Sequence, residues 1–480
     1  MNPNLALTLL IGLLATATAG AASASKPNFI IINIDDMGYA DIAPFGSTLN
    51  RTPNLDRMAK EGRKLTSFYA APVCSPSRAQ LMTGSYFKRV SVNYVFFPGD
   101  GIGLNPSEVT MAELLKKAGY VTGCVGKWHL GDQKGMLPTD QGFDEYYGIP
   151  YSNDMGPGED GAKSDLGKPL PVNDGKKKAG AGQPPLPLIR GDSNLVVRVK
   201  AQEQTELVSR YTGESVAFLK KHHDKPFLLY LAHSAVHFPI YPGKDFAGKS
   251  PNGIYSDWVE EVDWSVGKVL DAVRELKLSE NTLVIFTSDN GGTPRAVNKT
   301  LRGFKASTLE GGMRVPTIAW WPGRIPAGTS SDAIAGMIDV MPTFVKLAGG
   351  KTPSDRKIDG IDLWPVLSGQ KDAWGHAEYL YYKAGTRLGG ELEAVRLGEW
   401  KMEMKSGKLY NLTQDIGEST DVAAANPDVI TRIQKVAELA RTDLGDGPSG
   451  PNCRPLGKVE NPKPIIDQEG HLRDGFTPSK

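Results

Sequence analysis

The stretch Phe29-Ile30-Ile31-Ile32-Asn33-Ile34, with Asp35-Asp36 directly after it, is a continuous apolar run that ends in two carboxylates. Continuous rather than alternating hydrophobicity predicts a strand that is buried on both faces, as the strands of parallel sheets are. Three further runs have this form and also lead into polar residues: 120–125, 227–232 and 283–287. Helical patterns lie between the runs, so the sequence predicts an α/β fold with a mostly parallel sheet flanked by helices.

Polar residues follow each of the four runs. In sheets of this kind ligands bind beyond the carboxyl ends of the strands, so we expect these residues to meet on one rim. Those with the chemistry for a site are Asp35, Asp36, Lys127, His129, His233, His237, Asp289 and Asn290. Their carboxylates and the amide form an all-oxygen set, which suits a hard cation such as Ca²⁺ or Mg²⁺ better than Zn²⁺.

The composition is that of an ordinary globular protein. Among the 480 residues, 40% are hydrophobic, 23% are charged, and the net charge is +1. This balance gives no reason to expect a nucleic acid partner or a polybasic membrane contact. The length allows two or three domains, or one large domain with an appendage. Three cysteines, Cys74, Cys124 and Cys453, are too few for a disulfide scaffold.

The N-terminus has the pattern of a secretory signal peptide, which we assign to residues 1–25. An apolar run from Leu5 to Leu14 is followed by small residues through Ser25. The run is too short to span a bilayer. We therefore expect export to the periplasm or the extracellular space, without a membrane anchor.

Two domains are expected after this leader. Residues 26–373 carry the alternating strands and helices and form the predicted catalytic domain. Beyond them the pattern changes to short alternating strands, with a helix from about Pro427 to Leu444. We therefore assign residues 374–480 to a small α+β C-terminal subdomain with a short antiparallel sheet, and to a tail from Gly445 without regular signals. The Gly-, Pro- and Lys-rich segment from Gly156 to Gly191 is expected to be a surface insertion.

The segment Cys74-Ser75-Pro76-Ser77-Arg78 is expected at the start of a helix that stops at Gly84. Pro76 suits the first helical position, since its missing N–H needs no partner there. Cys74 would then lie at the positive end of a helix dipole, where an anionic group is favoured. The segment, with Thr83-Gly84 after it, resembles the signature of the type I sulfatases, Cys-x-Pro-x-Arg followed by Thr-Gly.

Four other segments resemble the same family. Gly126-Lys127-Trp128-His129-Leu130-Gly131 is similar letter for letter, and Val236-His237-Phe238-Pro239 is similar to the family's His-x-Pro segment. Lys305 with Glu310-Gly311-Gly312-Met313-Arg314-Val315-Pro316 resembles its Lys-x4-Glu-Gly-Gly-x-Arg-x-Pro block. Gly148-Ile149-Pro150-Tyr151-Ser152-Asn153-Asp154 is similar to a segment of the arylsulfatase A and galactosamine-6-sulfatase branch.

The resemblance extends from Asn28 to about Gly417 and implies the alkaline-phosphatase-like fold, one bound Ca²⁺, and a formylglycine (3-oxoalanine) made from Cys74 by a formylglycine-generating enzyme. The implied metal ligands are Asp35, Asp36, the modified Cys74, Asp289 and Asn290. The implied catalytic residues are Cys74, Arg78, Lys127, His129, His237 and Lys305. The implied contacts to the substrate sulfate are Lys127, Ser152, His237 and Lys305. Arg314 is expected to be structural, and His233 stays open as a buried partner or a substrate contact.

In the mechanism that the resemblance implies, one hydroxyl of the hydrated aldehyde attacks sulfur while His237 protonates the leaving alcohol. His129 then assists the release of sulfate. The predicted activity is hydrolysis of sulfate monoesters on oligosaccharides or polysaccharides. Two alternatives stay open at this point. One is a phosphonate monoester or phosphodiester hydrolase of the same superfamily, and the other is an exported sulfated-glycan-binding protein whose Cys74 is never oxidised.

Overall fold

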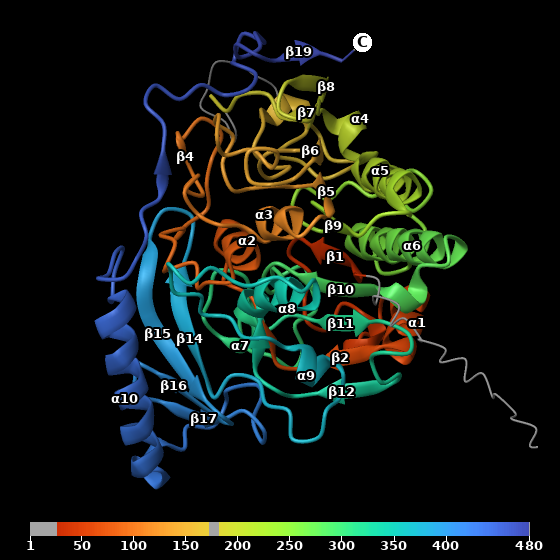
Figure 1. Cartoon of the computed structure of the whole chain (residues 1–480). Helices are drawn as coiled ribbons and strands as arrows, with labels where there is room; N and C mark the ends of the chain where they lie inside the picture. The colour runs from red at the N-terminus through yellow and green to blue at the C-terminus, as the bar shows by residue number, and fades with distance from the viewer. Residues whose placement is uncertain (1–25, 172–181, 480) are drawn as a thin grey trace, which may run out of the picture.

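The computed structural model describes residues 26–171 and 182–479. Its centre is a sheet of eleven strands in the order β12-β2-β11-β10-β1-β9-β5-β6-β7-β8-β19 (Figure 1). The expected signal peptide, residues 1–25, lies outside the described residues.

The five central strands of this sheet are parallel: β10 (Thr282–Ser288), β1 (Asn28–Ile34), β9 (Phe227–Ala232), β5 (Val121–Gly126) and β6 (Glu145–Gly148). Beyond β10 lie β11 (Thr317–Trp320), β2 (Arg63–Leu65) and β12 (Thr329–Ser331), and beyond β6 lie β7 (Pro187–Arg190), β8 (Asn194–Arg198) and β19 (Thr477–Pro478). Antiparallel pairing begins at β10–β11 on one side and at β6–β7 on the other. The predicted α/β fold is confirmed, and its parallel region is flanked by antiparallel strands.

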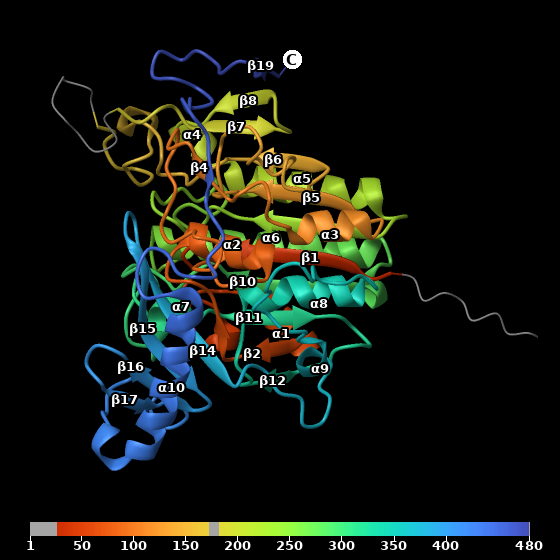
Figure 2. The same ribbon diagram turned by 60° about the vertical axis from the view of Figure 1, so that its left-hand side comes forward.

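Helices cover both faces of the sheet (Figure 2). One face carries α1 (Pro53–Glu61), α5 (Leu207–His222) and α6 (Ile254–Glu275), and the other carries α2 (Cys74–Thr83), α3 (Met111–Lys117) and α8 (Val340–Leu347). Short elements complete the first part of the chain: η1 (Ala43–Phe45), β3 (Phe68–Tyr69), β4 (Ile102–Gly103), η2 (Gly158–Asp160), α4 (Ala201–Gln204), η3 (Ser279–Asn281), α7 (Glu310–Met313), β13 (Ala335–Gly336), η4 (Met337–Asp339) and α9 (Trp364–Leu367).

The side chains of β1 explain why its sequence is apolar without alternation. Ile30, Ile32 and Ile34 pack into the core beneath α5 and α6. Phe29 and Ile31 pack into the opposite core, beneath α3 and α8. All five are fully buried. Because successive side chains of a strand point to opposite faces, a strand covered on both sides needs apolar residues at every position.

The C-terminal part contains the expected antiparallel sheet, formed by β14 (Glu378–Ala384), β15 (Gly389–Leu397), β16 (Trp400–Glu403) and β17 (Leu409–Asn411). After η5 (Ala423–Ala425), the helix α10 (Pro427–Leu444) packs against this sheet, seen at the lower left of Figure 1. The sheet and its helix therefore form the small α+β unit that the sequence predicts.

Two segments differ from their sequence expectations. In the tail after Gly445, β18 (Gly457–Lys458) pairs with β4, and β19 pairs with β8 at the edge of the large sheet. In the segment 156–191, β7 joins the large sheet, with Leu188 and Ile189 fully buried. These strands have two to four residues. Elements this short carry too few positions to show a hydrophobic period.

The helix α2 begins at Cys74, so Pro76 occupies its third position rather than its first. The N–H groups of a first helical turn have no intrahelical partner, which makes proline acceptable at this position as well. The helix ends as expected, because Gly84 adopts a left-handed conformation and its N–H donates to the Gln80 carbonyl at 3.0 Å.

Within residues 26–171 and 182–479, no helix is both long and apolar enough to cross a membrane. The three cysteines all lie in the described part of the chain and are free thiols. Cys124 is buried in β5, whereas Cys453 is half-buried in the C-terminal tail.

Gly126, the last residue of β5, allows a close approach that a side chain would block. Its φ is +111°, and an added Cβ would lie 1.9 Å from the Ala232 carbonyl oxygen of β9. We expect Gly126→Ala to lower the Tm far more than Gly119→Ala, as measured by thermal unfolding. Gly119 also has a positive φ, of +87°, but a Cβ there meets nothing within 4 Å. Gly119→Ala should thus cost only the conformational penalty of about 1–2 kcal/mol, and equal losses of Tm would contradict this account.

Candidate active site

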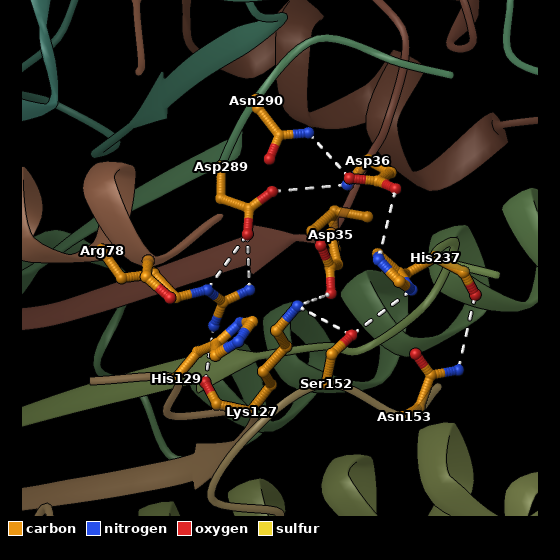
Figure 3. A network of polar contacts seen from close by, with 12 residues as sticks. Asp35, Asp36, Arg78, Lys127, His129, Ser152, Asn153, His237, Asp289 and Asn290 are labelled. Atoms are coloured by element: carbon orange, nitrogen blue, oxygen red, sulfur yellow. Dashed lines mark hydrogen bonds and ion pairs between the residues drawn. The ribbon is translucent and has the colours of Figure 1, made fainter. Parts of the chain in front are cut away.

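Side chains from four strand ends meet at the carboxyl edge of the sheet (Figure 3). They are Asp35 and Asp36 after β1, Lys127 and His129 after β5, His237 after β9, and Asp289 and Asn290 after β10. They are joined by Cys74 and Arg78 of α2, Ser152 after β6, and Lys305 in the loop before α7. The structure therefore brings the implied catalytic, metal-binding and sulfate-contacting residues into one largely buried cluster, whereas His233, also expected on this rim, contacts Ser265 outside it.

Arg78 connects the start of α2 to the end of β10. Its Nε and Nη2 donate to Asp289 Oδ2 at 3.0 and 2.7 Å, and its Nη1 donates to the Lys127 carbonyl at 2.5 Å. The side chains of Arg78 and Asp289 have no exposed area. A buried charge-assisted pair of this kind fixes both partners in one geometry. Arg78 thus holds Asp289 in place and ties the helix to the strand.

Two lysines pair with the two carboxylates that follow β1. Lys127 Nζ donates to Asp35 Oδ2 at 2.5 Å and to Ser152 Oγ at 3.2 Å (Figure 3). Lys305 Nζ donates to Asp36 Oδ1 at 2.5 Å. Lys127 and Asp35 have no exposed side-chain area, whereas 17% of the Lys305 side chain is exposed. The two lysines therefore bring two positive charges to the same small volume.

The carboxylates in this volume disturb one another. Burial and the neighbouring Asp35 raise the pKa of Asp289 above its ordinary value. Burial also acts to raise the pKa of Asp36, but the charge of Lys305 and a nearby histidine outweigh it and hold that pKa below the ordinary value. A site with three carboxylates in a medium of low dielectric favours additional positive charge.

Several oxygens of this cluster have the chemistry of metal ligands. Asp35 Oδ1 and Asn290 Oδ1 are buried and have no hydrogen-bond partner among the described residues. Ligand atoms of Asp35, Asp36 and His237 lie within 4.8 Å of one another. Asn290 Nδ2 donates to Asp36 Oδ1 at 2.7 Å, so the amide nitrogen of Asn290, and not its oxygen, faces Asp36. Unsatisfied buried oxygens are costly, and a set of carboxylate and amide oxygens fits Ca²⁺.

Cys74 is fully enclosed at the first position of α2. Burial raises the pKa of its thiol, as do the charges of Asp35 and Asp289. Lys127 and Lys305 act in the opposite direction without reversing the shift. The position of Cys74 at the helix N-terminus predicts that an anionic group is favoured there. In the structure, burial and the two carboxylates outweigh the favourable charges, so an unmodified Cys74 is a neutral thiol near pH 7.

His129 is held in a defined orientation. Its backbone has a φ of +64°, a conformation uncommon for a residue with a side chain. Nε2 lies 3.0 Å from the Phe96 carbonyl oxygen, which assigns the ring proton to Nε2. Nδ1 is buried and has no partner among the described residues. Burial, with Lys127 and Arg78, holds the pKa of His129 well below its ordinary value. His129 is therefore neutral, with a lone pair on Nδ1.

His237 lies on the other side of the cluster. Its Nδ1 is 2.5 Å from the Phe238 carbonyl oxygen and 3.4 Å from Ser152 Oγ. Its Nε2 is 3.7 Å from Asp36 Oδ2. Asn153 Nδ2 donates to the His237 carbonyl at 3.4 Å (Figure 3). The imidazole thus lies between the carboxylates and the segment that carries Ser152.

Sequence reasoning missed two residues that support this cluster. Asn153 was quoted only as part of a motif, yet its amide holds the segment of His237. Tyr230 lies within the apolar run of β9, and its hydroxyl accepts from Asn33 Nδ2 at 3.3 Å and from Arg78 Nη1 at 3.4 Å. A hydroxyl inside an otherwise apolar strand was the available signal, because a buried polar group needs a partner.

Two residues considered from the sequence have contacts outside the site. His233 Nε2 lies 2.9 Å from Ser265 Oγ of α6, and burial lowers the pKa of His233 to about 3. Arg314 Nε donates to the Thr66 carbonyl at 2.5 Å, and its Nη1 donates to Glu310 Oε2 at 3.3 Å. Both side chains are therefore bonded to residues outside the active-site cluster.

Known proteins are similar in sequence to most of this chain. The Sulfatase family profile matches residues 27–350, and the profile "N-sulphoglucosamine sulphohydrolase, C-terminal" matches residues 304–441. N-acetylgalactosamine-6-sulfatase of Canis lupus familiaris is 40% identical over 410 residues, which cover 82% of this chain and 74% of that protein. Arylsulfatase A of Homo sapiens is 34% identical over 471 residues, which cover 89% of this chain and 90% of that protein.

A solved structure shows the same similarity in three dimensions. The PsFucS1 sulfatase from Pseudoalteromonas sp. superposes with a TM-score of 0.77 at 29% identity, covering 87% of this chain and 91% of that one. The first family profile alone spans more than half of the chain. This protein therefore belongs to the sulfatase family and is a sulfuric ester hydrolase.

Proposed function

We propose that this sulfatase cleaves sulfate monoesters of carbohydrates, using a formylglycine made from Cys74 and a Ca²⁺ ion. The observation that supports it most directly is that Asp35, Asp36, Asp289 and Cys74 are buried together in one cluster. Two buried oxygens in the cluster have no partner among the residues described, which supports a cation at this point. The carbohydrate substrate is supported by the name of a relative, N-acetylgalactosamine-6-sulfatase.

The state of residue 74 decides which nucleophile the site can offer. A neutral thiol is a weak nucleophile, and burial raises the pKa of the Cys74 thiol. The hydrated aldehyde of formylglycine would supply a hydroxyl nucleophile at the same place. His129 belongs to the same cluster and is neutral, with a lone pair on Nδ1 that has no partner among the described residues, so it is suited to accept a proton from the formylglycine hydroxyl during sulfate release.

Asp35, Asp36, Asp289 and Asn290 are the residues that we expect to hold Ca²⁺, together with the modified Cys74. When bound, the ion would supply charge stabilisation at the sulfate oxygens and at the nucleophile. Lys127 and Lys305 would bind the sulfate of the substrate, because coordination of a cation by the carboxylates would leave both ammonium groups available. Ammonium groups bind such oxyanions through charge-assisted hydrogen bonds.

His237 and Ser152 are proposed to act on the side of the leaving group. His237 can donate a proton to the departing oxygen, and Ser152 Oγ, which is 3.2 Å from Lys127 Nζ, can add a hydrogen bond to the sulfate. Arg78 is proposed to support the nucleophile indirectly by fixing Asp289.

The remaining proposals concern maturation, export and domain structure. We propose that a formylglycine-generating enzyme oxidises Cys74 and that residues 1–25 direct export to the periplasm or the extracellular space. The apolar run at the N-terminus supports export. We further propose a catalytic domain of residues 26–373 and a C-terminal subdomain with its tail of residues 374–480.

Oxidation of Cys74 should be visible by mass spectrometry. In protein produced together with a formylglycine-generating enzyme, we expect the peptide from Leu65 to Lys88 to carry an aldehyde in place of the thiol. Cys74→Ser should lower sulfate release from an aryl sulfate by roughly 10³-fold or more, because serine has a single hydroxyl and cannot release bound sulfate by collapsing to an aldehyde as the diol can. Cys453→Ser is the matched control and should keep full activity. Near-normal turnover by Cys74→Ser, or an active enzyme with an intact thiol, would contradict the proposal.

Calcium should bind to the four oxygen ligands and stabilise the fold. We expect dialysis against a chelator to abolish turnover and lower the Tm, and added Ca²⁺ to restore both, since a ligand of the folded state stabilises it. Asn290→Ala should lose the Ca²⁺-dependent rise in Tm. Asp467→Asn should keep it, although Asp467, Glu469 and His471 form a separate exposed cluster. If Asp467→Asn loses the Ca²⁺-dependent rise in Tm while Asn290→Ala keeps it, the ion does not bind at the proposed site.

The role of His237 can be tested with leaving groups of different basicity. A nitrophenolate departs without a proton, whereas a sugar alkoxide does not. We therefore expect His237→Gln to reduce kcat on a sugar sulfate by roughly 10²–10⁴-fold, and much less on nitrophenyl sulfate. Lys127→Met should depress both reactions alike, because the sulfate is common to both substrates. Equal losses on both substrates in His237→Gln would exclude the leaving-group role.

Aryl sulfate and aryl phosphonate esters distinguish the proposed reaction from hydrolysis of phosphonates within the same fold. We expect a higher kcat/KM on the sulfate ester.

A further inference from the structure

The loop that carries Lys305 has an inner side fixed to the active site. The Lys305 N–H donates to the Gly292 carbonyl at 3.0 Å, and the Ala306 N–H donates to the Pro72 carbonyl at 2.8 Å. Gly292 follows the ligand pair at the end of β10, and Pro72 stands two residues before Cys74. These two hydrogen bonds place the loop beside both halves of the site.

The outer side of this loop contacts the C-terminal sheet through side chains. Arg302 Nη2 donates to Glu403 Oε1 at 2.6 Å, and its guanidinium lies 5.2 Å from the centre of the Tyr410 ring. Thr308 Oγ1 donates to Glu393 Oε2 at 2.8 Å. Glu403 belongs to β16, Tyr410 to β17 and Glu393 to β15. The loop is therefore held at both ends by three strands of the C-terminal sheet.

A third contact lies deeper, at Lys401 of β16. Its Nζ donates to the Thr308 carbonyl at 2.9 Å and to Glu310 Oε1 at 3.0 Å. It also forms an ion pair with Glu418 Oε1 at 2.8 Å, and it lies 4.1 Å from the centre of the Tyr381 ring. The side chains of Lys401, Glu310 and Glu418 have no exposed area. An ammonium buried between two carboxylates fixes all three groups, because moving any one leaves a charge without a partner.

These side-chain contacts add to the two backbone hydrogen bonds in a loop that has no regular secondary structure of its own. Between Ser288, the end of β10, and Glu310, the start of α7, the described chain contains no helix or strand. A lysine side chain is long and flexible, so its ammonium is placed only as well as its backbone is. Small displacements of binding groups weaken catalysis strongly.

We propose that the C-terminal sheet is a positioning device for Lys305: the contacts Arg302–Glu403, Thr308–Glu393 and Lys401–Thr308 hold its loop against the active site. This inference rests on the proposed role of Lys305 in binding the substrate sulfate. Arg302, Thr308 and Lys401 are positioning residues, since they act through Lys305 and do not touch the substrate.

The test uses the two outer contacts, because Lys401→Met would strand buried carboxylates and could unfold the protein. Arg302→Met and Thr308→Val each remove a hydrogen-bond donor whose glutamate partner, Glu403 or Glu393, is partly exposed. We expect each to raise the KM for an aryl sulfate and the inhibition constant of inorganic sulfate by roughly fivefold, with little change in kcat. In a Lys305→Met background the same changes should have no further effect, since the group that they position is gone.

Arg190→Met is the matched control. Arg190 also pairs with a glutamate, Glu214, at 2.5 Å and lies over a tyrosine ring, that of Tyr147, at 4.6 Å. It lies on β7 and has no contact with the Lys305 loop among its hydrogen bonds. We expect its substitution to leave both constants unchanged, which separates positioning from general destabilisation.

Hydrogen exchange tests whether these contacts hold the Lys305 loop, independently of activity. The amides of Lys305 and Ala306 should exchange faster in Arg302→Met and Thr308→Val than in the wild type and in Arg190→Met. Unchanged exchange, or equal losses with and without Lys305, would overturn the positioning role. If Lys305→Met leaves inhibition by sulfate unaltered, the proposed function of Lys305 fails instead, and the exchange rates still decide whether the sheet holds the loop.

Discussion

The structure depends on keeping three carboxylates, Asp35, Asp36 and Asp289, together in a buried site. Carboxylates that are buried in one cluster repel one another strongly, because water is excluded. The chain offsets the repulsion with one cation for each: Lys127, Lys305 and Arg78. Because the six groups come from five different segments, their pairing also fixes how those segments pack. The same charges that could hold a metal and an oxyanion therefore contribute to the specificity of the fold.

The parallel sheet makes this arrangement possible. Strands that run in one direction end at one edge, so the residues that follow each of them meet at that edge. In β1 the change is abrupt: Ile34 is the last strand residue, Asp35 accepts from Lys127, and Asp36 turns with a φ of +63°. In an extended chain, two adjacent side chains point to opposite faces. The left-handed conformation of Asp36, the second residue after the strand, changes this alternation, and both carboxylates lie in the site, each paired with its own lysine.

The sequence predicted the central strands and the residues that follow them, because a strand that is buried on both faces has apolar residues at successive positions. It also predicted the α+β unit, whose helix α10 has the expected bounds. It could not predict the contact of Lys401 with Glu310, since 91 residues separate them and nothing in a local pattern reports a long-range ion pair. The contacts of Tyr230 with Arg78 and of Asn153 with His237 were not predicted for the same reason, because they join residues far apart in the sequence. The short strands of the tail have too few residues to show a hydrophobic period.

Cys74 shows why position on a helix does not by itself decide chemistry. A helix dipole contributes about 0.3–1 kcal/mol at an exposed terminus, while full burial of a charge costs several kcal/mol. Cys74 is fully buried and two carboxylates lie near it, so the thiolate form is disfavoured despite the charges of Lys127 and Lys305. A site that disfavours a thiolate but surrounds residue 74 with cations and proton acceptors is suited to a neutral oxygen nucleophile that loses its proton only as it attacks. We propose that His129, which is neutral and whose Nδ1 has no partner among the described residues, accepts a proton from the formylglycine hydroxyl during sulfate release, where an anionic base would add to the negative charge of the site.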